Sequence, residues 1–340
     1  MKAMDLLAVQ RAGAHGGALG RRSWLGWLVC GAMALCTGSS FAQAYPNKPI
    51  RLIVPFGTSV MDAVARALSG PLGKALGQAV VVENIAGAGG LTGTTQLVRA
   101  PKDGYTIALV NNSHVINPSI YKDMPFDVLK DISPIGNVGH TPLILLVNPA
   151  VPAKDLRELI ALAKSKPGVL TYGSSGNGAI LHLAGVLLSS EADINIKHIP
   201  YKAAGQMFTD LIAGHIDMAL PAALTAAAQI QSGKLRAIGV TSQERSAALP
   251  DVPTLAEAGL PNYNIRGWIA MAAPAGVPKP IVDRLSTELN AALATPEVRA
   301  AFTKLDVTVT PSSPDAAAHF FQVELDKHTQ LVKRSGASLQ

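Results

Sequence analysis

The chain has 340 residues, of which 48% are apolar and 15% are charged. This length indicates roughly two domains of about 150 residues each, and this composition supports a buried core and excludes general disorder. The formal net charge of +6 is weak and scattered along the chain. A nucleic-acid surface needs Lys and Arg clustered on one face, so the sequence predicts no nucleic-acid partner.

The first 44 residues follow the pattern of a secretory signal. Arg21 and Arg22 precede an apolar run from Trp24 to Cys36, and small polar residues then lead to an Ala-Gln-Ala end. A membrane anchor needs about 20 apolar residues, more than this run provides. We therefore expect residues 1–44 to be a signal peptide cleaved near Ala44 and the product to be periplasmic. The general and twin-arginine export routes both stay open.

Both cysteines, Cys30 and Cys36, lie inside this segment, so the chain that follows it has no thiol. Disulfides, a cysteine nucleophile and cysteine-bound metals or clusters are thereby excluded for the mature chain. The later histidines show no His-x-His or HExxH spacing. The sequence therefore predicts no metal site and no cofactor.

Short β-branched apolar runs alternate with amphipathic stretches after the signal. Near-continuous apolar runs are typical of strands in a sheet that is covered on both faces, and alternation with short Gly and Pro turns predicts an α/β architecture. The runs expected to form strands are 51–54, 79–82, 107–110, 143–147, 169–172, 216–219, 235–240 and 269–273.

Two segments beside predicted strands, at 147–149 and 265–267, are candidate crossings between two lobes. On this division, residues 45–147 and 268–340 form lobe 1, and residues 148–267 form lobe 2. Inside one helical stretch, Gly70-Pro71 predicts a kink or a break, because proline lacks the N–H that a helix interior needs.

Two glycine-rich segments match catalytic or nucleotide-binding motifs only in part. Gly173-Ser174-Ser175-Gly176-Asn177 has Asn177 where the nucleophile elbow G-x-S-x-G needs glycine. The segment 87–93 has its third glycine one place late for a dinucleotide loop, and no suitably placed acidic residue follows. We expect the second segment to be a tight turn before a helix.

Three junctions between a predicted strand and a predicted helix are rich in Gly, Ser, Thr and Asn. They are 55–59, 111–114 and 172–178. Ligands of α/β sheets bind beyond the carboxyl ends of strands, where helix N-termini offer unpaired N–H groups to a carboxylate or phosphate. Helix capping explains any one of these loops, but three together favour an anion site.

A series of short motifs also runs in one order through nearly all of the segment from Tyr45 to Ser338. Together these motifs resemble the periplasmic solute receptors of tripartite tricarboxylate transporters, the Bug-type family. The motifs are YPNKPIR at 45–51, IVPF at 53–56, VVVEN at 80–84, GAGG at 87–90, DGYT at 103–106, YGS at 172–174, HLA at 182–184, PYK at 200–202, GKLRA at 233–237, LPDVPT at 249–254 and APAG at 273–276.

The resemblance implies an α/β fold of the type II periplasmic-binding-protein class. Two lobes, each with a helix-flanked central sheet, would close on a ligand in the cleft between them, as in a Venus flytrap. The implied function is that of a monomeric solute-binding protein, not an enzyme, which captures a small carboxylate and delivers it to the membrane components of a tripartite transporter. An exported hydrolase-type enzyme on the same scaffold and a ligand-sensing partner of a signalling receptor are the alternatives.

The resemblance also implies the ligand-binding residues. Asp62 has two interpretations: it contacts the ligand, directly or through water, or it stands in the first turn of a helix because the helix dipole favours an acidic residue there. Trp268 either walls the pocket or belongs to the core. The residues assigned to the site are Gly57, Thr58, Ser59, Asp62, Asn112 and Ser113 from lobe 1, and Ser174, Ser175, Asn177, Gly178 and Ala203 from lobe 2.

Three departures from the family pattern make the expected pocket less polar. The first loop, at 57–61, is short and lacks paired glycines, while Ala179 and Pro221 stand where the family often has polar residues. A less polar pocket favours a ligand with more carbon for each carboxylate, such as a longer dicarboxylate or an aromatic acid.

Overall fold

The computed structural model describes residues 45–202 and 204–337, and both of its sheets belong to the unit that begins at Tyr45. The predicted signal peptide, residues 1–44, lies outside the described residues, and so does Ala203. Within the described ranges, no helix is both long enough and apolar enough to cross a membrane.

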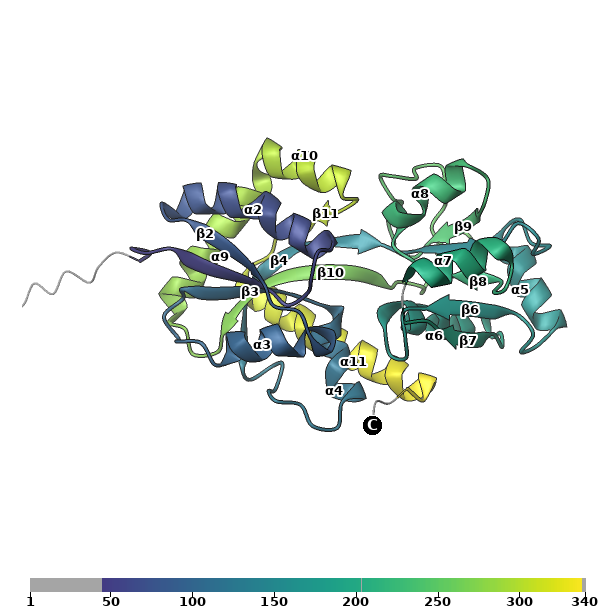
Figure 1. Cartoon of the computed structure of the whole chain (residues 1–340), viewed down its shortest axis with the longest axis horizontal. Helices are drawn as coiled ribbons and strands as arrows, with labels where there is room; N and C mark the ends of the chain where they lie inside the picture. Colours follow the sequence, from purple (N-terminus) through teal and green to yellow (C-terminus); the bar gives the residue numbers. More distant parts are fainter. Residues whose placement is uncertain (1–44, 203, 338–340) are drawn as a thin grey trace, which may run out of the picture. The chain divides into compact units, whose positions relative to one another are not determined.

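A six-stranded sheet is built from both ends of this unit (Figure 1). β1 is parallel to β2 and β3, whereas β10 runs antiparallel to its neighbours β3 and β4. The strand order is β11-β4-β10-β3-β1-β2, with β1 at Ile50–Val54, β2 at Val80–Asn84, β3 at Thr106–Asn111, β4 at Ile132–Pro142, β10 at Arg266–Pro274 and β11 at Thr308–Val309.

Helices cover this sheet because each presents an apolar stripe to it. In α2, the buried side chains of Val64, Leu68 and Leu72 recur at helical spacing and pack in one core with Leu52 of β1. The helices that follow or flank these strands are α2 (Val60–Leu76), η1 (Ala88–Gly90), α3 (Leu91–Val98), α4 (Asn112–Ile120), α9 (Lys279–Ala294), α10 (Pro296–Lys304) and α11 (Pro314–Ser335).

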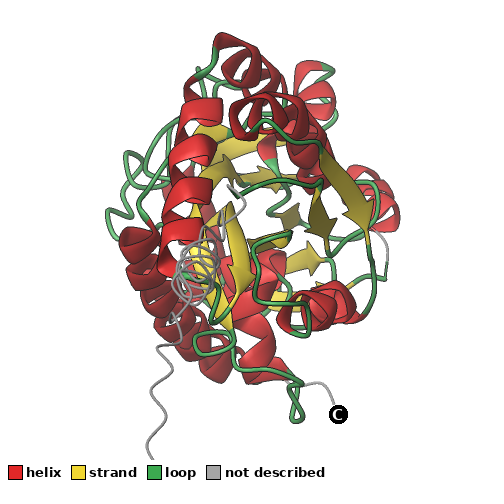
Figure 2. Ribbon diagram, turned by 90° about the vertical axis from the view of Figure 1, so that its left-hand side faces the viewer, coloured by secondary structure: helices red, strands yellow, loops and turns green. Residues whose placement is uncertain are grey.

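A five-stranded sheet is built from the middle of the chain, in the order β7-β6-β8-β5-β9. Its core is largely separate and includes Leu145, Leu159 and Leu183. Both sheets are flanked by helices (Figure 2), so the predicted α/β class is confirmed. The elements are β5 (Ile144–Val147), α5 (Leu156–Ser165), β6 (Thr171–Ser174), α6 (Ile180–Ala192), β7 (Lys197–Pro200), α7 (Ala204–Ala213), β8 (Met218–Ala219), α8 (Ala223–Gln231) and β9 (Arg236–Val240).

The chain passes between the two sheets at few points. β4 ends at Pro142 and β5 of the other sheet begins at Ile144, while the return is made just before β10, where Ile265 N–H donates to the Thr241 carbonyl oxygen. The predicted lobe limits at 147/148 and 267/268 stay a prediction. β5, which ends at the first of these limits, pairs with β8 and β9 of the five-stranded sheet.

Of the kink or break predicted at Gly70-Pro71, the break is wrong, because α2 runs through both residues; the kink stays a prediction. Two features explain the continuity. Gly70 has no Cβ to meet the proline ring, which removes the usual clash before a proline. On either side, Leu68 and Leu72 are fully buried, and their packing holds both halves of the helix on the sheet.

Gly93 in α3 allows the helix to approach the end of β1. A Cβ at Gly93 would lie 2.7 Å from the Ile85 carbonyl oxygen and 2.8 Å from Pro55 Cα, so backbone would have to move. We expect Gly93→Ala to lower the free energy of unfolding by about 1–3 kcal/mol, as overpacking does. In contrast, a Cβ at Gly205 near the start of α7 meets nothing within 4 Å, so Gly205→Ala should be neutral or slightly stabilising. Urea denaturation of both variants checks this; equal effects would contradict it.

Candidate ligand-binding site

A cavity of about 420 Å³ lies beyond the ends of strands from both sheets. Its walls come from the segments that follow β1, β3, β6 and β8, together with the start of β10. This is the position where α/β sheets bind ligands. The lining residues are Phe56, Ser59, Val60, Met61, Asn111, Asn112, Ser113, Thr141, Leu143, Ile180, Leu181, Ala222, Gly267, Trp268 and Ile269.

Three of the residues that the family resemblance assigned, Ser59, Asn112 and Ser113, are among those that line this cavity. Ala203 lies outside the described residues. The other assigned residues, which are close in sequence to lining residues but not part of the lining, are Gly57, Thr58, Asp62, Ser174, Ser175, Asn177 and Gly178. Their role in binding stays a prediction.

On the side of the six-stranded sheet, polar side chains cap the helices that start at the cavity. Ser59 Oγ accepts from Asp62 N–H at 3.4 Å at the start of α2. Asn111 Oδ1 accepts from Ser113 N–H at 3.0 Å, and His114 Nδ1 accepts from Asn111 N–H at 3.1 Å, which completes a capping box on α4. The sequence places Asn111 in the polar junction 111–114, but Asn111 is not among the residues assigned to ligand binding.

Asn112 ties the start of α4 to β10. Its Nδ2 donates to the Arg266 carbonyl oxygen at 3.1 Å, and its Oδ1 accepts from Trp268 N–H at 2.9 Å. An amide nitrogen carries two hydrogens, and the bond to Arg266 uses one of them. The side chain therefore fixes the crossing segment of β10 against the cavity as well as lining it.

The carboxylate of Asp62 is hydrogen-bonded to a side chain of its own helix. Arg66 Nε donates to both carboxylate oxygens at 3.1 Å, and Arg66 Nη2 donates to Asn84 Oδ1, whose amide nitrogen in turn donates to the Phe56 carbonyl oxygen. Hydrogen bonds from Arg66 and then from Asn84 hold the pKa of Asp62 below its usual value. Asp62 thus braces the loop after β1.

On the side of the five-stranded sheet, two helices begin at the cavity without a side-chain cap. The N-cap residues are Ala179 for α6 and Ala222 for α8, and alanine has no side-chain acceptor. The first N–H groups of a helix have no partner within it, and they carry the positive end of the helix dipole. Ile180, Leu181 and Ala222 line the cavity, so this wall combines apolar side chains with main-chain donors.

The loop between β6 and α6 is held by a cluster of buried and half-buried side chains. Ser174 Oγ lies 2.6 Å from His198 Nε2, and Gly178 N–H donates to His182 Nδ1 at 3.0 Å. The rings of His182 and His198 stack with centroids 3.8 Å apart. Burial lowers the pKa of both imidazoles to about 4, so both are neutral near pH 7. Ser174 therefore organises the loop from inside.

The cavity is polar in places but carries no net charge. None of its lining residues, all within the described ranges, is Asp, Glu, Lys, Arg or His. Across residues 45–202 and 204–337, no group of three or more His, Cys, Asp and Glu side chains is placed to hold a metal ion. The chemistry on offer is hydrogen bonding from hydroxyls, amides and helix N-termini beside apolar walls, which suits binding of an acid with a carbon body.

Comparison with known proteins identifies the family. Residues 64–337 match the model of the tripartite tricarboxylate transporter family receptor, TctC. Protein BugT of Bordetella pertussis is 36% identical over 303 residues, which cover 88% of this chain and 93% of the relative. The chain therefore belongs to the TctC family of solute receptors.

Solved structures agree with this assignment. The periplasmic binding protein BugD is 34% identical, with a TM-score of 0.70 over 87% of this chain and 100% of that one. Rpa4515 of R. palustris with adipate is 28% identical, with a TM-score of 0.74 over 87% and 100%. MatC of Rhodopseudomonas palustris with bound malate is 28% identical, with a TM-score of 0.69 over 85% and 100%.

These comparisons settle three of the expectations drawn from the sequence. The fold is that of the TctC and Bug periplasmic binding proteins, which confirms the predicted fold class. Members of the family are binding receptors, so the prediction that the protein is not an enzyme is confirmed and the hydrolase alternative is wrong. The protein is a periplasmic solute-binding protein of this family.

The histidine cluster makes folding stability depend on pH. The unfolded chain protonates His182 and His198 near pH 6.5, whereas the folded chain does so only near pH 4. The free energy of unfolding should therefore have its full value above about pH 6.5 and decline as the pH falls from there to about 4. His182→Gln should make this decline shallower by about one proton. Urea denaturation in pH steps measures it.

The exposed His319 provides the control for this experiment. His319→Gln should leave the dependence of stability on pH as in the parent protein. A decline as steep in His182→Gln as in the parent would contradict the assignment of a neutral, buried His182.

Proposed function

We propose that this receptor captures a carboxylate with a long carbon body, a longer dicarboxylate or an aromatic acid, and delivers it as a monomer to the membrane components of a tripartite transporter. The observation that carries the proposal is the composition of the cavity. Main-chain donors at two alanine-capped helix starts and the polar residues of the α4 start face a space with largely apolar walls.

Carboxylates suit this site because they are acceptors only. Oxygen atoms of an ionised carboxylate take up N–H groups at a helix N-terminus without any cationic side chain. Ser59 and Ser113 add hydroxyl groups on the opposite wall. A ligand with an acid group at each end would engage both sides of the cavity at once.

The apolar walls favour a ligand with several methylene or ring carbons. Phe56, Met61, Leu143, Leu181 and Ile269 all line the cavity. Each methylene transferred from water to such a surface contributes about 0.8 kcal/mol. The related structures carry adipate in one case and malate in another, and the apolar lining of this chain favours the longer, less polar type.

Export and delivery complete the proposal. The N-terminal pattern of residues 1–44 supports a signal peptide, and membership of the TctC family supports a tripartite transporter as the recipient. A ligand-sensing role toward a signalling receptor would use the same cavity, and pull-down from membranes with and without ligand distinguishes it.

Succinate and adipate provide a matched test of ligand length. Both have two carboxylates, and adipate has two more methylenes, so burial in the apolar cavity should make it bind about tenfold more tightly. Isothermal titration of ligand-stripped protein measures both affinities. A thermal-shift panel that adds malate, citrate and benzoate tests the wider class, since a ligand at 100 Kd stabilises by about 2.7 kcal/mol. Silence across the panel, or tighter binding of succinate, would contradict the proposal.

Ala222 allows a test of how the acid is recognised. Ala222→Asp and Ala222→Asn add nearly the same volume at the cavity, and both can cap α8, but only Asp adds a negative charge. We expect the Asp variant to bind adipate about tenfold or more weakly than the Asn variant, because like charges repel in a partly desolvated site. Titration of both variants at pH 7 measures the ratio. Equal affinities would show that the acid group lies elsewhere.

A further inference from the structure

The helix α11 connects the surroundings of the cavity to the core of the five-stranded sheet. Near its start, Phe320 and Phe321 pack against the ring of Trp268, with centroids 5.3 and 5.4 Å away. Near its end, Leu331 and Val332 belong to the core of the five-stranded sheet. One helix therefore contacts both of the sheets whose flanking segments line the cavity.

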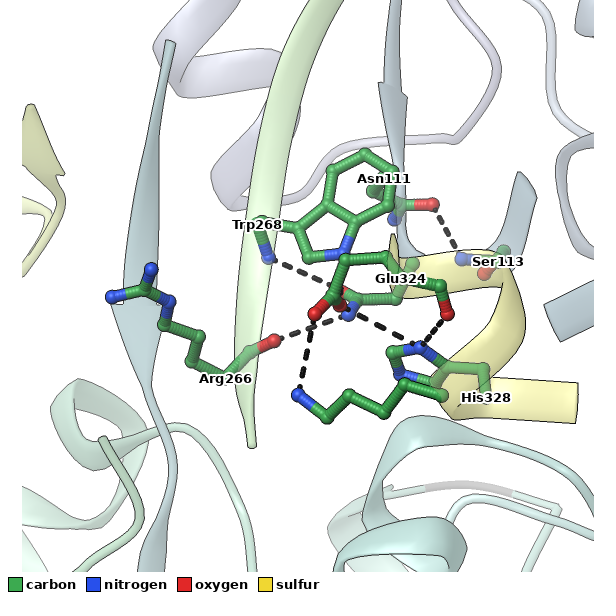
Figure 3. A network of polar contacts seen from close by, with 8 residues as sticks. Asn111, Ser113, Arg266, Trp268, Glu324 and His328 are labelled. Atoms are coloured by element: carbon green, nitrogen blue, oxygen red, sulfur yellow. Dashed lines mark hydrogen bonds and ion pairs between the residues drawn. The ribbon is translucent and has the colours of Figure 1, made fainter. Parts of the chain in front are cut away.

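At the middle of α11, the buried carboxylate of Glu324 faces Trp268 (Figure 3). Trp268 Nε1–H donates to Glu324 Oε2 at 2.9 Å, and Lys327 Nζ donates to Oε1 at 3.2 Å. His328 Nδ1 lies 2.8 Å from the Glu324 carbonyl oxygen; because a carbonyl only accepts, Nδ1 carries the proton. Burial lowers the pKa of His328, so the neutral form is favoured.

A buried carboxylate lowers the free energy of unfolding through the desolvation of its charge. An apolar residue of similar size would avoid the cost of removing a charge from water. Lys327 supplies a cation at Oε1, whereas Oε2 accepts from the indole N–H of Trp268 at 2.9 Å and lies 3.5 Å from Nδ1 of His328. The carboxylate therefore has a directional task, which is to fix the orientation of one tryptophan.

Trp268 and its neighbours are held from the opposite side by Asn112. The Asn112 amide bonds to the main chain of Arg266 and of Trp268, so Glu324 and Asn112 grip the same three-residue segment of β10. Both Trp268 and Asn112 line the cavity. The indole of Trp268, its main-chain N–H and the Asn112 side chain therefore belong to one connected hydrogen-bonded group.

From this arrangement we infer that Glu324 is a positioning residue for ligand binding. By its hydrogen bond to the indole, Glu324 fixes the orientation of Trp268 and, through the Trp268 main chain, the position of Asn112 in the cavity. Both positions are thereby tied to α11. Glu324 does not line the cavity itself. The inference rests on the proposed function, since it assigns Glu324 a part in the affinity for a carboxylate.

The test compares Glu324→Leu with Glu324→Gln, using adipate as the probe. Leucine has similar bulk but no acceptor, so Trp268 Nε1 loses its partner, and adipate affinity should fall about tenfold or more. Glutamine keeps an amide oxygen for the indole and should bind adipate within about threefold of the parent. Lys327 is partly exposed and can turn to solvent in either variant. Titration calorimetry gives both affinities, and urea denaturation shows that the samples are folded.

Glu288 of α9 supplies the matched control. It is also partly buried and paired with a cation on its own helix, Arg284 at 3.1 Å, but it does not line the cavity. Glu288→Leu should lower stability and leave adipate affinity unchanged. A Glu324→Leu protein that is folded and binds adipate like the parent overturns the inference, and so does equal loss in the Gln and Leu variants.

A second measurement needs no ligand. Trp268 is the only tryptophan after residue 44, so the tryptophan emission of the chain from Tyr45 onward, excited where tyrosine does not absorb, reports on this side chain alone. Glu324→Leu should shift its emission and change its quenching by acrylamide, whereas Glu324→Gln and Glu288→Leu should not. Unchanged emission in Glu324→Leu overturns the inference. If the parent protein fails to bind adipate while the emission shift occurs, the proposed ligand class fails and the link from Glu324 to Trp268 stands.

Discussion

The main-chain N–H groups at the starts of helices are the constraint on which this site depends. A helix cannot satisfy its own first donors, so each start at the cavity leaves them to a capping side chain, to water or to a ligand. The helix starts at the cavity are of two kinds. α2 and α4 are capped by Ser59 and Asn111, whereas α6 and α8 start after Ala179 and Ala222, which have nothing to offer. One side of the cavity is thus preorganised, and the other presents open donors.

Side chains with two roles also occur where the chain crosses between its sheets. Asn112 bonds to two main-chain groups of β10, and Glu324 bonds to the indole of Trp268 in the same strand. Residues that line the cavity are therefore also residues that fix the crossing segment. The same hydrogen bonds therefore join the lining of the cavity to the segment by which the chain returns to the six-stranded sheet.

The sequence predicts much of this fold because the signals are local. The run 51–54 lies within β1 and 269–273 lies within β10, since both are continuous apolar strands inside a covered sheet. In contrast, β4 was missed because Gly136, Gly139 and other turn-forming residues interrupt its apolar pattern. A Cβ at Gly139 would lie 2.6 Å from the Thr308 carbonyl oxygen, so the close approach of β11 explains this glycine, and it is a tertiary contact that no local pattern reveals.

The residues that line the cavity also divide into those that the sequence predicts and those that it does not. Ser59, Asn112 and Ser113 carry polar side chains that a search for hydrogen-bonding residues finds, and they line the cavity. Ile180, Leu181 and Ala222 escape such a search because their side chains are apolar and their contribution is main-chain N–H groups. The sequence signal that would have found this wall is an alanine at the N-cap position of a helix. Under the proposed function, helix dipoles that serve any carboxylate would hold the acid group, so discrimination between acids would fall to the apolar walls and to the orientation of Trp268.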